Sequence, residues 1–378
     1  MKAIVTKALD RIKTEETVKA KARPKRRKKA EYDDEALTKL LEASKAKISV
    51  VGVGGGGCNT IQRMTQVGIL GAETIAVNTD AQDLLKVKAG RKILIGRKLT
   101  RGLGSGSDPS VGEASAQESI EELTDLLADS DLVFITCGMG GGTGTGAAPV
   151  VAELVKKVKA LTIGVVTMPF TVEGKKRMEN AMHGIANLRQ YADTVIIIPN
   201  DKILEIAPDL PVNAAFKVAD EVLTNAVKGI TEMITKPGLI NLDFADLRTI
   251  LEKGGAAMIG LGESTVKGGT SPDARALEAV ENALTSPLLD VDISHANRAL
   301  INVVGGSDMT LREAEMIVEA VSVKIHSNAH IIWGAMIDDT IPKNHIQAMV
   351  VIAGGKFPYL DGNAKDMEHI DLGVQFAD

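Results

Sequence analysis

A glycine-rich segment between an apolar run and a helical pattern restricts the fold more than any other feature. The run Asp131–Cys137 is typical of a buried strand, and residues 138–146 read Gly-Met-Gly-Gly-Gly-Thr-Gly-Thr-Gly. Glycines let successive backbone N–H groups turn toward one anion, and the next helix adds the positive end of its dipole. A tight turn is the alternative, but the five glycines and two threonines of residues 140–146 predict a phosphate-binding loop. Its hydroxyls could donate to phosphate oxygens or reach a bound Mg2+.

Apolar strand candidates alternate with helical patterns over the first half of the chain. The strand candidates are 48–53, 74–78, 132–137, 162–167 and 194–199, and the helical patterns lie near 58–67, 113–128, 145–159 and 174–190. Strands separated by helices indicate a parallel sheet with both faces covered, whose following loops meet along one edge. The fold class predicted is α/β, with a doubly wound, mostly parallel sheet.

The second half begins with the longest helical pattern, from Pro211 to about Thr235, which stops at Pro237-Gly238. The elements predicted beyond it are helices over 243–252, 272–284 and 310–324, and strands over 256–262, 299–304, 329–337 and 345–353. Because their order is mixed, we expect a second, smaller α/β domain with a mixed sheet, joined to the first by the long central helix.

The charge is distributed unevenly. Residues 1–30 contain twelve Lys or Arg and three acids, a charge of +9, so the rest carries −14 of the total of −5. The basic arm is either a solvated, disordered tail or an arm that touches anionic lipid or nucleic acid. An acidic body with 3% aromatic residues argues against a nucleic-acid-binding domain.

The sequence has no apolar run of the ~20 residues that span a bilayer and no signal-peptide core, so we expect a cytoplasmic protein without direct membrane insertion. Its two cysteines, Cys58 and Cys137, lack CxxC spacing and are interpreted as small buried thiols.

Three further loops follow other predicted strands. Gly52–Asn59 is a second glycine loop that leads into a helix, Asn78-Thr79-Asp80 follows the next strand, and Arg101–Pro109 is rich in glycine and serine. Several such loops at one sheet edge require an anion larger than one pyrophosphate, so a nucleoside triphosphate is the expected ligand.

Several nucleotide-binding classes lack their motifs here. Gly174-Lys175 and Gly355-Lys356 are not followed by Ser or Thr, so no P-loop is present, and the kinase motifs are missing. A dinucleotide-dependent oxidoreductase that uses Gly54–Gly57 remains an alternative, although it leaves residues 140–146 unexplained.

The segment 140–146 resembles the signature of the tubulin/FtsZ family of GTPases, and the resemblance covers about residues 47–353. The other matching segments are 54–57, 78–80, 101–104, 169–170, 173–177, 198–201, 216–220 and 241–246. The helix before the first strand resembles that of archaeal members. The resemblance implies a tubulin/FtsZ-like fold that binds GTP and GDP with Mg2+.

The resemblance also assigns the nucleotide contacts. Asn59 and Asn200 would contact guanine, Phe216 would lie against its face, and Asp220 would accept from its ring N–H and exocyclic amine, which favours guanine over adenine. The full GTP-binding set is Gly54, Gly55, Gly56, Gly57, Cys58, Asn59, Asn78, Asp80, Gly104, Ser105, Gly106, Gly140, Gly141, Gly142, Thr143, Gly144, Thr145, Gly146, Glu173, Arg177, Asn200, Phe216 and Asp220. Glu173 and Arg177 would hold the ribose and a nearby phosphate. Taken alone, Phe216 and Asp220 are explained as core and solvated face of one helix.

The catalytic residues implied by the resemblance are Asn241, Asp243 and Asp246. The two carboxylates would polarise the attacking water in the pocket of the neighbouring subunit, and Asn241 would help to position it. Seen alone, two acids three residues apart at a helix start are explained as capping. One departure is Asp108 before Pro109, where many relatives have Asn, which adds negative charge near the expected γ-phosphate. No metal ligand from the protein is assigned.

The family implies assembly with copies of itself, head to tail, into protofilaments that scaffold the division ring at mid-cell. Adaptors and ring regulators would bind the apolar terminal peptide at 370–376, and a GTP-binding regulator that does not polymerise is the alternative. The boundaries expected are a disordered basic extension over 1–32, a short helix over 33–46, a GTP-binding domain over 47–211, the central helix over 212–236, a C-terminal assembly domain over 237–354 and a flexible tail over 355–378.

Overall fold

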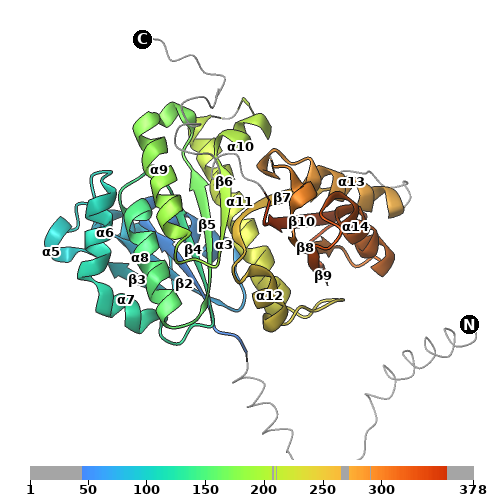
Figure 1. Ribbon diagram of the computed structural model, residues 1–378, viewed down its shortest axis with the longest axis horizontal. Coiled ribbons are helices and arrows are strands. Elements are labelled where there is room, and N and C mark those ends of the chain that lie inside the picture. The colour runs from blue at the N-terminus through green and yellow to red at the C-terminus, as the bar shows by residue number, and fades with distance from the viewer. Residues whose placement is uncertain (1–44, 207, 210, 265–271, 290, 356–378) are drawn as a thin grey trace, which may run out of the picture. The chain divides into compact units, whose positions relative to one another are not determined.

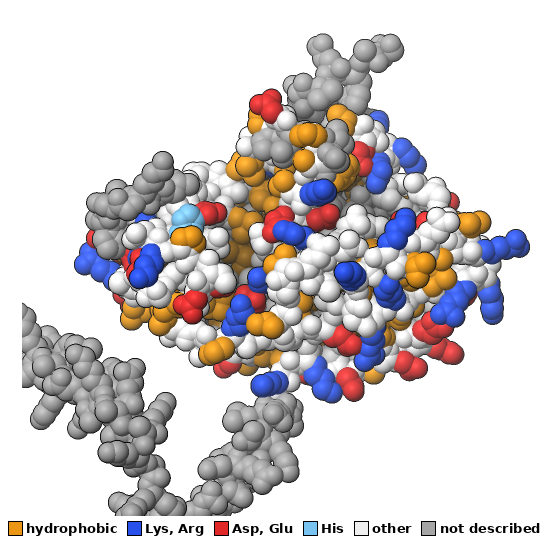
Figure 2. Space-filling model, turned by 180° about the vertical axis from the view of Figure 1, so that it is seen from behind, with side chains coloured by type: hydrophobic (Ala, Val, Ile, Leu, Met, Phe, Trp, Pro, Cys, Tyr) orange, Lys and Arg blue, Asp and Glu red, His pale blue; other side chains and the backbone are white. Residues whose placement is uncertain are grey.

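The computed structural model describes residues 45–206, 208–209, 211–264, 272–289 and 291–355 (Figure 1). The predicted basic extension, the helix over 33–46 up to residue 44, and the tail from residue 356 lie outside the described residues. None of the described helices is long and apolar enough to cross a bilayer. Lys, Arg, Asp and Glu side chains are spread over the face of the molecule that is seen in Figure 2.

The elements up to the sixth strand follow the predicted alternation of strand and helix. They are β1 (Ile48–Val53), α3 (Gly54–Val67), β2 (Ala72–Asn78), α4 (Ala81–Lys86), β3 (Arg91–Leu94), α5 (Arg97–Thr100), α6 (Pro109–Glu118), α7 (Ile120–Leu127), β4 (Leu132–Gly138), α8 (Thr143–Lys157), β5 (Leu161–Met168), the 3-10 turn η1 (Thr171–Glu173), α9 (Lys175–Leu188) and β6 (Thr194–Pro199).

The remaining elements are of mixed order, as the sequence predicts. They are α10 (Asp201–Ile206), α11 (Val212–Thr235), α12 (Phe244–Leu251), β7 (Gly255–Glu263), α13 (Pro272–Leu284), the 3-10 turns η2 (Pro287–Leu289) and η3 (Ile293–His295), β8 (Arg298–Gly305), α14 (Leu311–Lys324), β9 (His330–Ile337) and β10 (Ile346–Ala353). The long helix α11 ends one residue before the predicted boundary at 236.

The strands among the described residues form one sheet in the order β3-β2-β1-β4-β5-β6-β7-β10-β8-β9. In this order, the strands from β3 to β7 are all parallel to one another. Strand β10 is antiparallel to both β7 and β8, and β9 is parallel to β8. The predicted parallel sheet and the predicted mixed sheet are therefore continuous. They join where Thr194–Ile196 of β6 pairs with Gly255–Ala257 of β7.

Both faces of the parallel part are covered by helices, so its strands are apolar at successive positions. Val50 belongs to the core shared with α3 and α11, whereas its neighbour Val51 belongs to the core shared with α8 and α9. Burial on both faces explains why these strands read as continuous apolar runs. A third core lies between the C-terminal strands and the helices α13 and α14.

The structure differs from the prediction at one helix that is split, one helix start and one additional strand, each for a local reason. The pattern over 113–128 is two helices, because Ser119 leaves the helical conformation and its Oγ accepts from Gly96 N at 3.2 Å. Helix α3 begins at Gly54 rather than near 58, since the glycine loop itself forms the first turn. Strand β3 was not predicted, because this edge strand is short and begins with two exposed charged residues.

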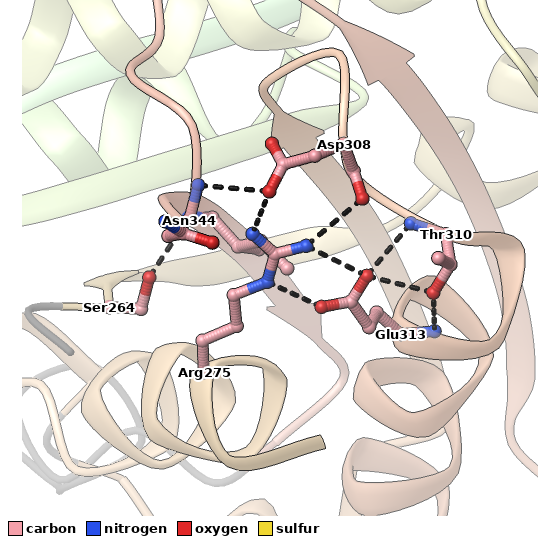
Figure 3. Close-up of polar contacts among 7 residues, drawn as sticks. Ser264, Arg275, Asp308, Thr310, Glu313 and Asn344 are labelled. Atoms are coloured by element: carbon pink, nitrogen blue, oxygen red, sulfur yellow. Dashed lines mark hydrogen bonds and ion pairs between the residues drawn. The ribbon is translucent and has the colours of Figure 1, made fainter. Parts of the chain in front are cut away.

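A buried ion-pair network holds the C-terminal part together (Figure 3). The Arg275 guanidinium, on α13, bridges Glu313 in the first turn of α14 and Asp308 in the loop before it, with Nη2–Oε2 and Nη1–Oδ2 distances of 3.0 and 2.6 Å. Thr310 caps α14 and donates to Glu313, and the backbone N–H of Asn344 donates to Asp308. One guanidinium therefore joins two helices and two loops.

Burial alone would raise the pKa of Glu313, but the hydrogen bonds from Arg275 and Thr310 outweigh it and hold that pKa below its ordinary value. A carboxyl whose folded-state pKa is depressed stabilises the fold above its unfolded pKa. That stabilisation is lost as the pH falls through the folded-state pKa.

Replacing Glu313 by Ala should lower the free energy of unfolding by about 3–5 kcal/mol, because Arg275 is 5% exposed and would lose its main partner. The measurement is the denaturant midpoint and slope. Arg312→Ala is the matched control, since this arginine pairs with Asp273 while its side chain is 75% exposed, and its loss should cost less than about 1 kcal/mol. Equal effects of the two substitutions would contradict a structural role for the buried network.

Candidate functional site

A cavity of about 570 Å3 opens where the carboxyl ends of the parallel strands meet. Its walls come from the loops after β1, β2, β4, β5 and β6, from the loop before α6, and from one face of α11. Most of the predicted nucleotide-binding residues line it, namely Gly55, Gly56, Asn59, Asp80, Gly104, Ser105, Gly106, Gly141, Gly142, Thr143, Gly144, Glu173, Arg177, Asn200, Phe216 and Asp220. Residues that are distant in the sequence thus face one space.

The other predicted members support this wall from behind without lining the cavity. They are Gly54, Gly57, Cys58, Asn78, Gly140, Thr145 and Gly146. The Thr145 hydroxyl accepts from the backbone N–H of Gly140 at 2.9 Å, so it closes the loop on itself. Burial raises the pKa of the Cys58 thiol to about 12, which makes it a neutral core side chain.

Sequence reasoning missed some of the lining. Val53, Leu103, Ser107, Gly138, Met139, Thr167, Pro169, Ala219 and Leu223 also face the cavity. Val53, Gly138 and Thr167 lie at or next to the carboxyl ends of strands, which is a signal the sequence does contain. Ala219 and Leu223 lie on α11 about one and two turns after Phe216, and only the packing of α11 against the sheet brings them to the cavity.

The glycine loops are packed too closely for side chains. A Cβ on Gly54, whose φ of +71° already favours glycine, would lie 2.8 Å from Gly144 N. One on Gly142 would lie 2.7 Å from Asp108 N, and one on Gly146 would overlap the carbonyl oxygen of Pro109. The loop after β4 is therefore clamped between the loop after β1 and the start of α6. Close backbone approach, with N–H groups at the start of α8, is what an anion site requires.

At the other end of the cavity lie an aromatic ring and a carboxyl group on α11. The ring of Phe216 meets Phe170 edge to face with centroids 5.1 Å apart, and remains 41% exposed. Burial raises the pKa of Asp220 to about 6, although a hydrogen bond from Thr60 opposes the shift. The buried Oδ1 of Asn200 has no hydrogen-bond partner within the described chain. An exposed ring beside an acceptor-rich wall suits a flat base with several N–H donors.

Glu173 and Arg177 lie side by side on the wall, with a distance of 3.1 Å between Oε2 and Nη1. The Oε1 of Glu173 accepts from the backbone N–H of Phe170, so the carboxylate is held while half of the arginine remains exposed. Such a pair presents an acceptor and a charged donor to a ligand that carries hydroxyl and phosphate groups.

Asp108 does not line the cavity. Its carboxylate caps α6 by accepting from the backbone N–H and the hydroxyl of Ser110, and these bonds hold its pKa below the ordinary value. Asparagine at this position would form the same cap. The extra charge is therefore directed to the helix rather than to the ligand space.

Asn241, Asp243 and Asp246 do not line the cavity of their own chain. Both acids are exposed, and Asp243 caps α12 by accepting from the backbone N–H of Asp246 at 2.8 Å. The loop that carries them is pinned to β9, because Ile240 pairs with Ala335 and the Asn241 amide oxygen accepts from Gly238 N. The acids are thus presented outward on a fixed loop.

The described residues contain no group of three or more His, Cys, Asp or Glu that could enclose a metal ion. Single carboxylates, from Asp80, Glu173 and Asp220, face the cavity at separate positions. This donor set suits a Mg2+ ion that is held mainly by phosphate and water oxygens.

Two family models match the chain: the GTPase domain of the Tubulin/FtsZ family over residues 47–208, and the C-terminal domain of the FtsZ family over residues 255–356. The Cell division protein FtsZ 1 of Thermococcus kodakarensis is 59% identical over 86% of this chain and 85% of that protein. Its counterpart in Archaeoglobus fulgidus is 55% identical over 96% of this chain and 95% of that protein.

Among solved structures, the FtsZ dimer of M. jannaschii is similar with a TM-score of 0.80 and 57% identity, over 85% of this chain and 92% of that one. Both the sequence and the fold are therefore shared along nearly the whole described chain. The protein belongs to the tubulin/FtsZ family, in its FtsZ branch, and is a GTPase that binds guanine nucleotide.

Proposed function

We propose that this protein assembles head to tail into protofilaments, and that each GTP is hydrolysed between two subunits. The observation that carries the proposal is that Asp243 and Asp246 are exposed and face outward on a fixed loop, outside the cavity of their own chain. A second subunit would bring the two parts together. Because the surfaces joined are different, the contact repeats without closing and generates an open filament.

Exposed apolar side chains at the cavity support such a contact. Leu103 lines the cavity yet is 81% exposed, and Val172, which precedes Glu173, is 87% exposed. Beside the acidic loop, Leu239 is 49% exposed. Apolar side chains of this size are covered when a partner binds. The related protein of M. jannaschii was solved as a dimer, which also favours self-association.

In the bound state, guanine would lie against Phe216, and Asp220 would accept from its ring N–H and exocyclic amine. Asn59 and the unpartnered oxygen of Asn200 would complete recognition of the base. The glycine loops and the start of α8 would hold the phosphates. Mg2+, bound mainly through phosphate oxygens, would offset charge on the β- and γ-phosphates.

In the filament, the neighbouring Asp243 and Asp246 would polarise the attacking water, and Asn241 would help to position it. Hydrolysis would then depend on assembly, and loss of the γ-phosphate would favour release of subunits. We assign the filaments to the division ring at mid-cell in the cytoplasm, because the similar proteins are named for cell division. Attachment to the membrane would run through an adaptor or regulator bound to the C-terminal peptide.

Substituting Asp243 by Asn should lower GTP turnover by about 100-fold, within the range that general-base assistance supplies, while GTP affinity is unchanged. Asparagine keeps the cap of α12, so thermal stability should not change. Asp243→Ala removes the cap as well and serves to separate the two roles. Turnover of Asp243→Asn equal to wild type would refute the catalytic assignment.

GTPase activity per molecule should rise with protein concentration and reach a plateau, because each active site requires a second subunit. The measurement is phosphate release together with light scattering over a concentration series. When a small fraction of wild-type protein is added to the Asp243→Asn variant, hydrolysis should return only at contacts where a wild-type subunit supplies its acids to the GTP of a neighbouring subunit. Constant activity per molecule down to nanomolar protein would instead indicate a complete site within one chain.

GTP affinity should fall as the pH drops below about 6, where the free protein binds a proton at Asp220. Guanine requires the carboxylate, so the affinity should decrease by up to about tenfold per pH unit below that pKa and remain constant above pH 7. Calorimetry between pH 5 and 8 measures this.

Asp220→Asn is the control for the pH dependence. It should remove the dependence and shift preference toward xanthosine triphosphate, whose ring carries a carbonyl where guanine carries an amine. A pH dependence that persists in Asp220→Asn would assign the titration to another group.

A further inference from the structure

Three hydroxyl groups from three separate loops meet behind the phosphate-binding wall. The Oγ1 of Thr143 lies 2.7 Å from the Oγ1 of Thr79 and 2.9 Å from the Oγ of Ser105. Thr143 and Ser105 line the cavity, whereas Thr79 is fully buried and does not. The three side chains therefore form a short hydroxyl chain with one closed end, at Thr79, and one end at the cavity.

The closed end determines the direction of the hydrogen bonds. A hydroxyl has one hydrogen and two lone pairs. Within the described part of the chain, the only hydrogen-bond partner of the Thr79 hydroxyl is Thr143. If Thr143 donated to Thr79, the Thr79 hydrogen would be buried without an acceptor, which is unfavourable. Thr79 is therefore the donor, and the Thr143 hydrogen is left for Ser105 or for a ligand.

We propose that Thr79 is a positioning residue for phosphate binding: because its buried hydroxyl donates to Thr143, the bonded pair Thr143 and Ser105 keeps one hydrogen for the cavity. The inference rests on the proposed placement of the phosphates at Thr143. The hydroxyl chain then presents one hydrogen to the cavity, which suits an anionic phosphate oxygen, and we place Thr143 and Ser105 against a phosphate rather than on Mg2+. Polarisation along the chain strengthens the last hydrogen bond.

Thr79 is suited to this role because its own backbone is fixed. Its N–H donates to the side-chain oxygen of Asn78 at 2.9 Å, and its carbonyl accepts from the N–H of Gly104 and the hydroxyl of Thr100, each at 3.3 Å. The Asn78 side-chain oxygen thus holds the loop, while its buried amide nitrogen has no partner among the described residues. The Ser105 end is fixed as well, since its Oγ packs against Gly142, where a Cβ would overlap it.

The test compares equilibrium affinities for GTP and guanosine, each with Mg2+ and with chelator. Thr79→Val should lower the affinity for GTP by about tenfold, which is equivalent to one hydrogen bond of about 1.4 kcal/mol. It should leave the affinity for guanosine unchanged. Thr79→Ser, which keeps the hydroxyl, should stay within about twofold of wild type. The loss should be the same with and without Mg2+. A loss that appears only with Mg2+ would assign Thr143 to the metal and overturn the proposal.

Thr136→Val is the matched control, since Thr136 is a fully buried threonine whose hydroxyl has no partner among the described residues. It should leave affinity unchanged, and equal effects of Thr79→Val and Thr136→Val would overturn the proposal. If Thr79→Val does not fold, Thr79→Ala against Thr136→Ala makes the same comparison.

A double-mutant cycle with Thr143→Val separates positioning from general damage. If Thr79 acts through Thr143, the double variant should bind GTP no more weakly than Thr143→Val alone. Additive losses would overturn the proposal. Normal GTP affinity of Thr143→Val itself would show instead that the phosphates do not lie at Thr143, which is a failure of the proposed function.

Discussion

Close backbone packing around the loop after β4 is the constraint on which the rest of the site depends. Gly54, Gly142 and Gly146 lie where a Cβ would overlap a neighbouring backbone atom, so three loops and two helices approach within contact distance. That approach places Ser105 and Thr79 against Thr143 and leaves the first turn of α8 open to a ligand. A single side chain at one of these glycines would separate the loops. The proposed phosphate site therefore depends on the packing of several segments and not on one segment alone.

The parallel strands and the C-terminal strands of the sheet support different parts of the site. The strands that end at the cavity are buried on both faces, so their carboxyl ends are held rigidly while the loops after them vary in length. The acidic loop between α11 and α12 has a different support, because it is pinned to β9, in the mixed part of the sheet. Since β6 pairs with β7, both supports belong to one continuous sheet. The cavity and the acidic loop are thus supported by one continuous sheet, which suits the head-to-tail assembly that we propose.

The sequence was most informative where chemistry depends on local pattern. The apolar runs, the glycine loops and the stop at Pro237-Gly238 predicted most of the strands and the long helix, and resemblance to a family supplied the roles that we propose for Phe216 and Asp220. The sequence was less informative where tertiary contacts determine where an element forms or ends. Ser119 breaks a helical pattern because its hydroxyl binds Gly96, and β3 forms although two of its four residues are exposed and charged. Thr145 and the side-chain oxygen of Asn78 have the atom types of a ligand site, yet they accept hydrogen bonds from the backbone of their own loops. No spacing rule distinguishes a side chain that holds the ligand from one that holds the loop.

The same distinction explains why Thr79 is not found by a search for ligand contacts. Thr143, Ser105 and Thr79 are equivalent in a sequence, but burial separates them, since a hydroxyl without access to water loses free energy when it has no protein acceptor. If water reached Thr79, it could donate or accept a hydrogen bond there, and the hydrogen bonds among the three hydroxyls would have no fixed direction. Because one end of the hydroxyl chain is closed against the core, the chain has a direction and leaves one hydrogen for the cavity, at a site where the ligand brings negative charge. Selectivity for an anion is in this way set by a residue that the anion does not touch.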